Sequence, residues 1–192
     1  NDGATPLFIA AQNGHNDMAT LLLAHGATVD AASNDGATPM YIAVEHGHIE
    51  MATLLLAHGA TVHTACNDGS TPIYIAAENA HNDLATLLLA RGASVNAACN
   101  DGSTPIYIAA QEGHDDLATL LLAHGATVDA ACNDGSTPLF IAAENGHEDM
   151  ARLLLACGAT VDAACNDGAT PLFIAAQNGH IDISTLLLAH GA

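Results

Sequence analysis

Residues 1–33 read NDGATPLFIAAQNGHNDMATLLLAHGATVDAAS, and this stretch decides the fold because close copies of it follow one another to residue 192. A fixed period of this length predicts a solenoid of stacked structural units. We expect a single domain over residues 1–192. Its repeats are 1–33, 34–66, 67–99, 100–132, 133–165 and 166–192. Asn-Asp-Gly opens each repeat, at Asn1, Asn34, Asn67, Asn100, Asn133 and Asn166.

Each repeat carries the signals of two short helices. In the first, Thr5 can cap a helix N-terminus, and Pro6 suits the first helical position because its missing N–H leaves nothing unpaired. An apolar run continues this helix, and Gly14 ends it. In the second, residues 15–25 carry a broad apolar stripe, and Gly26 again gives the stop. Residues 28–36 are rich in turn-forming residues and predict an extended segment with a turn.

Helices this short do not persist alone in water, so the repeats must stack and bury each other's apolar faces. Spacing and pattern therefore predict an all-α solenoid.

Five landmarks in the repeat are similar to the ankyrin repeat. They are Thr5-Pro6-Leu7, Ala10-Ala11, Gly14-His15, Leu21-Leu22-Leu23 and Gly26-Ala27, and they recur over essentially the whole chain. The resemblance implies paired antiparallel helices, β-hairpin fingers between repeats, and a concave groove that binds protein partners. One departure is an aromatic row where that family usually has histidine. It comprises Phe8, Tyr41, Tyr74, Tyr107, Phe140 and Phe173.

Composition excludes several classes of partner. Arg91 and Arg152 are the only strong bases against 21 acids, and the formal charge is −19. Nucleic acids and anionic membranes need rows of bases, so neither is an expected partner. No run of 18 apolar residues occurs, so no transmembrane helix is predicted. An electrostatically steered partner should be basic, or a cation.

By resemblance, protein partners would touch the finger tips, the exposed end of the first helix and the end of the second helix. The finger-tip residues are Asp2, Asp35, Asp68, Asp101, Asp134 and Asp167. The first-helix residues are Gln12, Asn13, Glu45, His46, Glu78, Asn79, Gln111, Glu112, Glu144, Asn145, Gln177 and Asn178. The second-helix residues are His25, His58, Arg91 and His124. These residues are acidic and amide-rich, so the complementary surface is basic or amide-bearing.

Metal sites and catalysis have little support in the sequence. The histidines recur at fixed repeat positions, and stacked helices 8–10 Å apart do not bring such rings to one zinc ion. His63 with Cys66 could touch a soft metal, and the oxygen-rich segment 30–36 could hold calcium, but a solvated side chain and a turn explain them as well. We therefore expect no metal, no cofactor and no enzymatic activity.

The spacing of the cysteines indicates the redox state of the cellular compartment. Cys66, Cys99, Cys132 and Cys165 lie one repeat apart, farther than the roughly 7 Å between Cα atoms that a disulfide allows. Free thiols favour a reducing, intracellular and cytoplasmic setting.

Two alternatives to a protein-binding scaffold stay open. Residues 1–27 and 166–192 differ only at Asn16/Ile181, Met18/Ile183 and Ala19/Ser184, although specific binders usually vary from repeat to repeat. The chain could be a spacer or spring whose partner site lies on other segments, or an engineered, consensus-like protein with no native function. Because Leu7, Ile9, Leu186 and Leu187 keep internal-type apolar character at the ends, we also expect end-to-end association.

Overall fold

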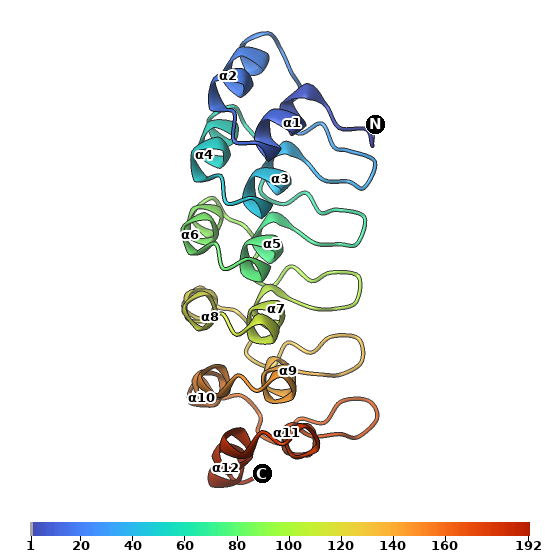
Figure 1. Ribbon diagram of the computed structural model, residues 1–192, viewed down its shortest axis with the longest axis vertical. Helices are drawn as coiled ribbons and strands as arrows, with labels where there is room; N and C mark the ends of the chain where they lie inside the picture. The colour runs from blue at the N-terminus through green and yellow to red at the C-terminus, as the bar shows by residue number, and fades with distance from the viewer. Residues whose placement is uncertain (1) are drawn as a thin grey trace. The chain divides into compact units, whose positions relative to one another are not determined.

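The computed structural model describes residues 2–192, which form two compact units divided after Cys99 (Figure 1). Unit 1 contains α1 (Pro6–Gln12), α2 (Asn16–Ala24), α3 (Pro39–Glu45), α4 (Ile49–Ala57), α5 (Pro72–Glu78) and α6 (Asn82–Ala90). Unit 2 contains α7 (Pro105–Glu112), α8 (Asp115–Ala123), α9 (Pro138–Asn145), α10 (Glu148–Ala156), α11 (Pro171–Asn178) and α12 (Ile181–Ala189). The single domain over the whole chain stays a prediction.

Each unit is a stack of three helix pairs. In unit 1 the first helices α1, α3 and α5 contact one another in order, and α2, α4 and α6 form a second row beside them. Unit 2 repeats this arrangement with α7, α9 and α11 in one row and α8, α10 and α12 in the other. Every first helix also packs on the second helix of its own repeat. The predicted all-α solenoid of helix–turn–helix repeats is thus confirmed within each unit.

All six first helices begin with proline at the first helical position, and four of them have the threonine cap that the sequence predicts, whereas Thr71 of α5 and Thr104 of α7 make no such cap. The Thr5 hydroxyl accepts a hydrogen bond from the Phe8 N–H at 3.2 Å, and Pro6 occupies the first helical position. The same cap forms at Thr38 with the Tyr41 N–H. These contacts satisfy N–H groups that have no partner inside the helix.

The second helices begin differently. Each is preceded by a histidine whose side chain makes no cap, and an acid lies in its first turn, such as Asp17 in α2 and Glu50 in α4. A negative charge there is favoured by the helix dipole. None of the helices in the described part of the chain has the length and hydrophobicity needed to span a bilayer.

The core of each unit lies between the two rows of helices. Met51 and Leu55 of α4 and Leu88 of α6 are fully buried in unit 1, as are Leu117 and Leu154 in unit 2. Small alanines at the helix contacts, such as Ala43 and Ala142, are also fully buried and let the helices approach closely. This packing fixes the side on which the fingers project (Figure 1).

The predicted β-hairpins are not confirmed, because no strand occurs in the fingers of residues 2–192. The finger around Asn34 is a tight loop, closed by hydrogen bonds from the Ser33 N–H to the Ala37 carbonyl and from the Gly36 N–H to the Ser33 carbonyl. The backbone bond between neighbouring fingers is a single one, from the Asn34 N–H to the Asp2 carbonyl. One such bond per finger does not make the ladder that defines a strand pair.

The apolar residues at the two ends are only partly those that the sequence indicated. Leu7, Leu186 and Leu187 are buried, because they face the other helix of their own repeat. Of the four predicted residues, Ile9 alone is exposed, with 45% of its surface accessible.

Candidate functional site

The finger-tip aspartates are exposed, and most of them also brace the finger. Asp68 accepts hydrogen bonds from both the backbone N–H and the hydroxyl of Ser70, at 2.9 and 2.6 Å. Asp101 makes the same pair with Ser103. This is a local turn in which the carboxylate holds the backbone two residues on. The predicted row therefore has a structural role that the sequence analysis did not assign to it.

These bonds change the acidity of the finger tips. Hydrogen bonds from Ser33 and Ser103 lower the pKa of Asp35 and of Asp101. The Cys132 thiol, followed by Ser136, lowers the pKa of Asp134 in the same way. Hydrogen bonds to a carboxylate stabilise its charged form. Asp35, Asp101 and Asp134 are therefore anionic throughout the neutral range.

In unit 1, the second position at the end of each first helix closes that helix. The side-chain N–H groups of Asn13 and Asn79 donate to the carbonyls of Ile9 and Ile75, four residues back. His46 does the same with the carbonyl of Ile42, at 3.1 Å. These side chains satisfy carbonyls that a helix end leaves without a partner. Their polar groups are only partly available to a protein partner.

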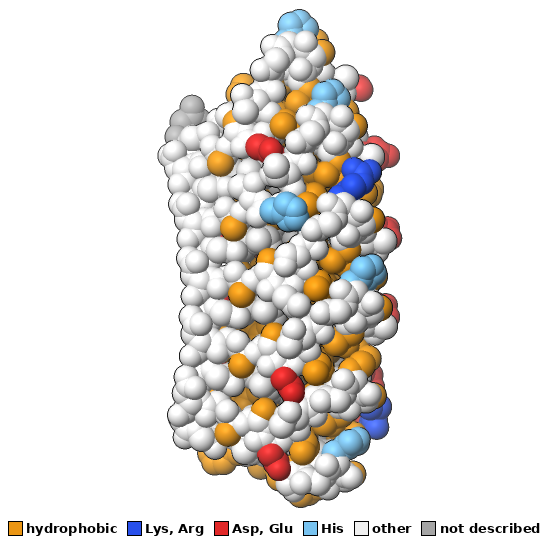
Figure 2. Space-filling model, turned by 180° about the vertical axis from the view of Figure 1, so that it is seen from behind, with side chains coloured by type: hydrophobic (Ala, Val, Ile, Leu, Met, Phe, Trp, Pro, Cys, Tyr) orange, Lys and Arg blue, Asp and Glu red, His pale blue; other side chains and the backbone are white. Residues whose placement is uncertain are grey.

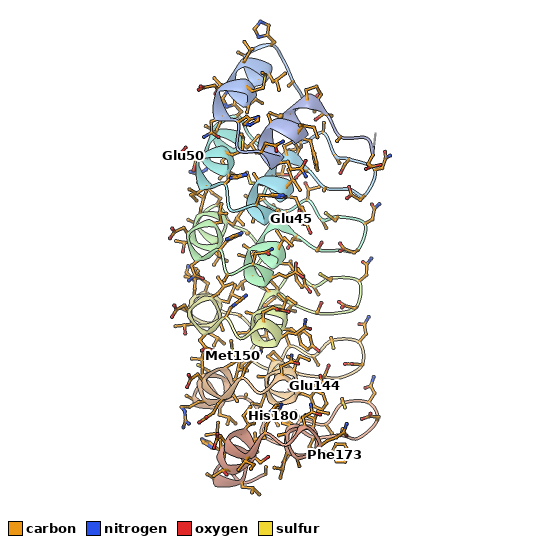
Figure 3. All side chains as sticks on the ribbon, in the orientation of Figure 1. Glu45, Glu50, Glu144, Met150, Phe173 and His180 are labelled. Carbon is orange, nitrogen blue, oxygen red and sulfur yellow. The ribbon has the colours of Figure 1, made fainter. Side chains whose placement is uncertain are left out.

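In unit 2 the equivalent amides reach the preceding repeat instead. The Asn178 amide donates to the carbonyl of Glu144 at 2.8 Å, and the Nε2 atom of His180 lies 3.0 Å from the same oxygen (Figure 3). Asn145 and His147 converge likewise on the carbonyl of Gln111. Because a carbonyl only accepts, Nε2 carries the proton in both histidines.

At the first position at the end of the first helices, two carboxylates are left without an internal partner. Glu45 on α3 and Glu144 on α9 are half-buried (Figure 3). Within residues 2–192, neither carboxylate forms a hydrogen bond or an ion pair. Gln12 and Gln177 occupy the equivalent positions, and Gln177 is exposed. In unit 2, Gln111 donates to its neighbour, Glu112.

The second-helix row lies at the helix C-termini, as predicted. His25, His58, Arg91 and His124 are the cap residues of α2, α4, α6 and α8. The Nδ1 atom of His25 lies 2.8 Å from the carbonyl of Leu21, so this nitrogen donates and the ring is held against its own helix. Histidine and arginine side chains stand out in Figure 2 against mostly uncharged surface. Arg152, the other strong base, pairs with Glu148 on its own helix.

The finger tips and first-helix ends thus present charge of one sign in each unit. In unit 1 the acids are Asp2, Asp35, Asp68, Glu45 and Glu78, and in unit 2 they are Asp101, Asp134, Asp167, Glu112 and Glu144. No lysine or arginine stands at these repeat positions, because both arginines of the chain lie on second helices.

The candidate calcium ligands are engaged in the stack. The carboxylate of Asp30 accepts from the Thr61 N–H of the next repeat at 3.1 Å, and Asp129 accepts from Thr160. Across residues 2–192, no group of three or more His, Cys, Asp or Glu side chains is placed to hold a metal ion. His63 is exposed, apart from any such group.

All five cysteines are free, as the repeat spacing predicted. Burial raises the pKa of the Cys66 thiol to about 11. The Cys165 thiol donates to Asp167, and this hydrogen bond raises the pKa of the thiol. A thiol that stays protonated is a poor nucleophile, which argues against a catalytic role.

His48 and His81, which precede α4 and α6, lock neighbouring repeats together. The Nε2 atom of His48 lies 3.1 Å from the carbonyl of Gln12, and His81 makes the same contact with Glu45. Gly14 leaves room for this ring, because a Cβ there would lie 3.0 Å from the His48 ring. His48 and His81 therefore brace the turns between neighbouring repeats.

The sequence analysis missed one buried network. The Tyr41 hydroxyl lies 3.1 Å from the Ser70 hydroxyl, and Tyr107 lies 3.0 Å from Ser136. The signal was present as a covariation over 29 residues: tyrosine is followed by serine, whereas Phe8 and Phe140 are followed by alanine.

Comparison with known proteins agrees with the geometry. A family model of ankyrin repeats matches the chain in three copies, over residues 1–66, 62–132 and 128–192. No curated protein matches the chain.

Proposed function

We propose, from the premise that this chain belongs to the ankyrin-repeat family, that its finger tips and first-helix ends bind a protein partner through a basic or amide-bearing surface. Ankyrin repeats are in general protein-interaction modules and typically non-enzymatic scaffolds. The proposed contacts are the finger-tip, first-helix and second-helix residues named above. The proposed setting is intracellular and cytoplasmic, where the five thiols stay reduced.

One observation carries the proposal: acids gather on the finger-tip and first-helix rows, where no lysine or arginine stands. The carboxylates of Glu45 and Glu144 have no hydrogen-bond partner within residues 2–192, whereas most of the neighbouring amides and finger aspartates are bonded internally. An unpaired carboxylate on a surface of one sign attracts a cation and steers its approach. Glu45 and Glu144 are therefore the side chains to which we assign the first contact with lysine or arginine of the partner.

A structural spacer is the second candidate. The near identity of residues 1–27 and 166–192 favours it, because a specific partner would select different side chains in different repeats. A spacer, like an engineered protein without native function, would show no preference among extended peptides.

The experiment measures binding of three synthetic peptides of equal length to the whole chain by calorimetry. One peptide alternates arginine with glycine and serine, one carries glutamate instead of arginine, and one carries glutamine. We expect binding of the arginine peptide alone, weakening as salt is added. No binding, or equal binding of all three, would overturn the proposal in favour of the spacer.

A pair of matched variants localises the contact. Glu45→Gln with Glu144→Gln removes two charges from the first-helix row, and Asp17→Asn with Asp182→Asn removes two exposed charges from second helices. Exposed ion pairs contribute about 0.5 kcal/mol each, so the first variant should weaken binding about five-fold and the second much less. Equal losses would show that net charge, and not this row, attracts the peptide.

A further inference from the structure

We propose that the two ends of the repeat array are complementary faces, and that copies of this chain associate head to tail with Phe173 of one copy against Ala4 of the next. The contact uses the first repeat of unit 1 and the last repeat of unit 2. It leaves the acidic finger tips and first-helix ends open, so it is independent of the proposed partner.

The face at α1 and α2 exposes residues that are buried elsewhere. Ile9 and Met18 are 45% and 50% exposed, whereas their equivalents Ile42 and Met51, which the preceding repeat covers, are 6% and 0% exposed. Leu21 is 53% exposed beside them. Next to these residues, Pro6, Leu22 and Ala31 line a mostly apolar hollow of about 240 Å³. This face has the chemistry of an internal repeat contact without its covering repeat.

The face at α11 and α12 shows the opposite half of the same contact. Phe173, which projects from α11, is 57% exposed, whereas Phe8 and Phe140 are each 8% exposed beneath the repeat that follows (Figure 3). Leu188 is 59% exposed, whereas its equivalent Leu155 is 9% exposed. In Figure 2, hydrophobic side chains gather along this end of unit 2.

The aromatic row indicates which residue should cover Phe173. Each tyrosine of the row is followed 29 residues later by a serine, and Tyr41 and Tyr107 bond to theirs. Each phenylalanine is followed at the same interval by an alanine, as in Phe8 with Ala37 and Phe140 with Ala169. The position equivalent to Ala37 and Ala169 in the first repeat is Ala4. A second copy therefore offers Phe173 the residue that phenylalanine meets elsewhere in the chain.

The difference between the two faces predicts which assemblies form. The two faces differ, so the contact is heterologous and extends to open chains of copies unless the rotation happens to close a ring. Each copy carries a formal charge of −19, and this repulsion opposes association. Added salt should therefore strengthen self-association, which is the reverse of its effect on the basic peptide.

The test uses two variants, each blocked at one face with uncharged polar residues so that the net charge stays the same. The first carries Met18→Gln with Leu21→Gln, and the second carries Phe173→Gln with Leu188→Gln. All four positions are at least half exposed, so the fold should persist, which circular dichroism checks. Sedimentation velocity is measured for each protein and for an equimolar mixture, in a dilution series up to about 1 mM.

We expect the unaltered chain to form species beyond the dimer as its concentration rises. Each blocked variant alone should stay monomeric, and their mixture should give a one-to-one dimer that grows no further. Dimers of a single blocked variant would overturn the polarity, since they require like faces to meet. An unaltered chain that stays monomeric throughout the series would overturn the proposal itself.

Matching of Phe173 to Ala4 is tested in the mixed dimer. Phe173→Tyr on the copy that supplies this face buries a hydroxyl against Ala4 and should weaken the dimer about five-fold. Ala4→Ser on the other copy should then restore the affinity, because it recreates the pair of Tyr41 with Ser70. If Ala4→Ser changes the affinity equally for Phe173 and for tyrosine at this position, the two residues do not meet.

Discussion

The hydroxyl of Tyr41 lies 3.1 Å from that of Ser70, whose own proton is directed to the carboxylate of Asp68 at 2.6 Å. The tyrosine therefore donates to the serine, and the serine donates to the aspartate. Burial raises the pKa of Tyr41, so the donor stays protonated. This chain of hydrogen bonds ties the first helix of one repeat to the finger tip of the next.

Removing both members of the pair should cost less than the sum of the two single changes. Ser70→Ala leaves the buried Tyr41 hydroxyl without an acceptor and should lower the free energy of unfolding by about 1–3 kcal/mol. Tyr41→Phe should cost about 1 kcal/mol. The double variant should lose less than the sum, because it reproduces the apolar pair of Phe140 with Ala169. Urea unfolding of the four proteins measures the coupling, and strict additivity would show that the two hydroxyls do not interact.

The turn after α5 holds an alanine in a conformation that favours glycine. Ala80 has φ of +56°, and it is the one residue other than glycine with positive φ among residues 2–192. Gly47 fills the equivalent place in the preceding repeat with φ of +73°. Ala80→Gly should therefore raise the free energy of unfolding by about 1 kcal/mol.

The matched control for Ala80→Gly is Gly47→Ala. Its new Cβ would lie 3.0 Å from the His81 ring, so it should destabilise the chain by at least as much as Ala80→Gly stabilises it. Thermal unfolding monitored by circular dichroism compares the two variants with the parent. A lower melting temperature for Ala80→Gly would contradict the assignment of strain to this turn.

The sequence predicted the helices and their order because glycine, proline and the apolar runs are local signals repeated at a fixed period. The β-hairpins that the resemblance implied for the fingers are not confirmed. Within each unit, one backbone bond joins a finger to the next, as from Asn67 to Asp35 and from Asn133 to Asp101, and that is too few for a strand.

The candidate surface was predicted only as a set of positions. Sequence alone does not show that the amide of Asn13 is used at its own helix end and that of Asn178 on the preceding repeat. It also does not show that Asp68 is tied to Ser70 while Glu45 is left open. Those differences depend on the local backbone geometry, which the residue type alone does not reveal. The pairing of Tyr41 with Ser70 was the exception, because tyrosine and serine recur together at a fixed interval in the sequence.

Finger stability should be lost in acid. Hydrogen bonds from Cys132 and Ser103 lower the pKa of Asp134 and of Asp101 in the folded chain, below the ordinary value of 3.8. A lowered pKa contributes stability above the unfolded value, and that stability disappears as pH falls through the folded value. Asp134→Asn with Asp101→Asn keeps an oxygen acceptor in each turn but does not titrate.

This double variant should therefore lose less stability than the parent between about pH 4 and pH 2. Chemical unfolding at each pH measures the difference. Asp17→Asn with Asp182→Asn removes the same number of charges outside the fingers and is the control. If both double variants reduce the loss of stability in acid equally, the finger hydrogen bonds are not the cause of that loss.

The first residue of α8 should show the opposite pH dependence. Burial, and then the nearby charge of Asp149, raise the pKa of Asp115, and its Oδ1 atom is buried without a hydrogen-bond partner in the described part of the chain. A raised pKa means that folding favours the protonated acid, so the ionised Asp115 destabilises the fold at neutral pH, and this cost falls as pH drops through the folded value.

The equivalent positions in unit 1 include Asn16 and Asn82, which carry no charge. Asp115→Asn should therefore raise the melting temperature at pH 7 by a few degrees, and the gain should shrink toward pH 4. Asp116→Asn, one residue on and exposed, removes the same charge, and an equal, pH-independent gain from it would show that general repulsion, and not the buried carboxylate, sets the effect.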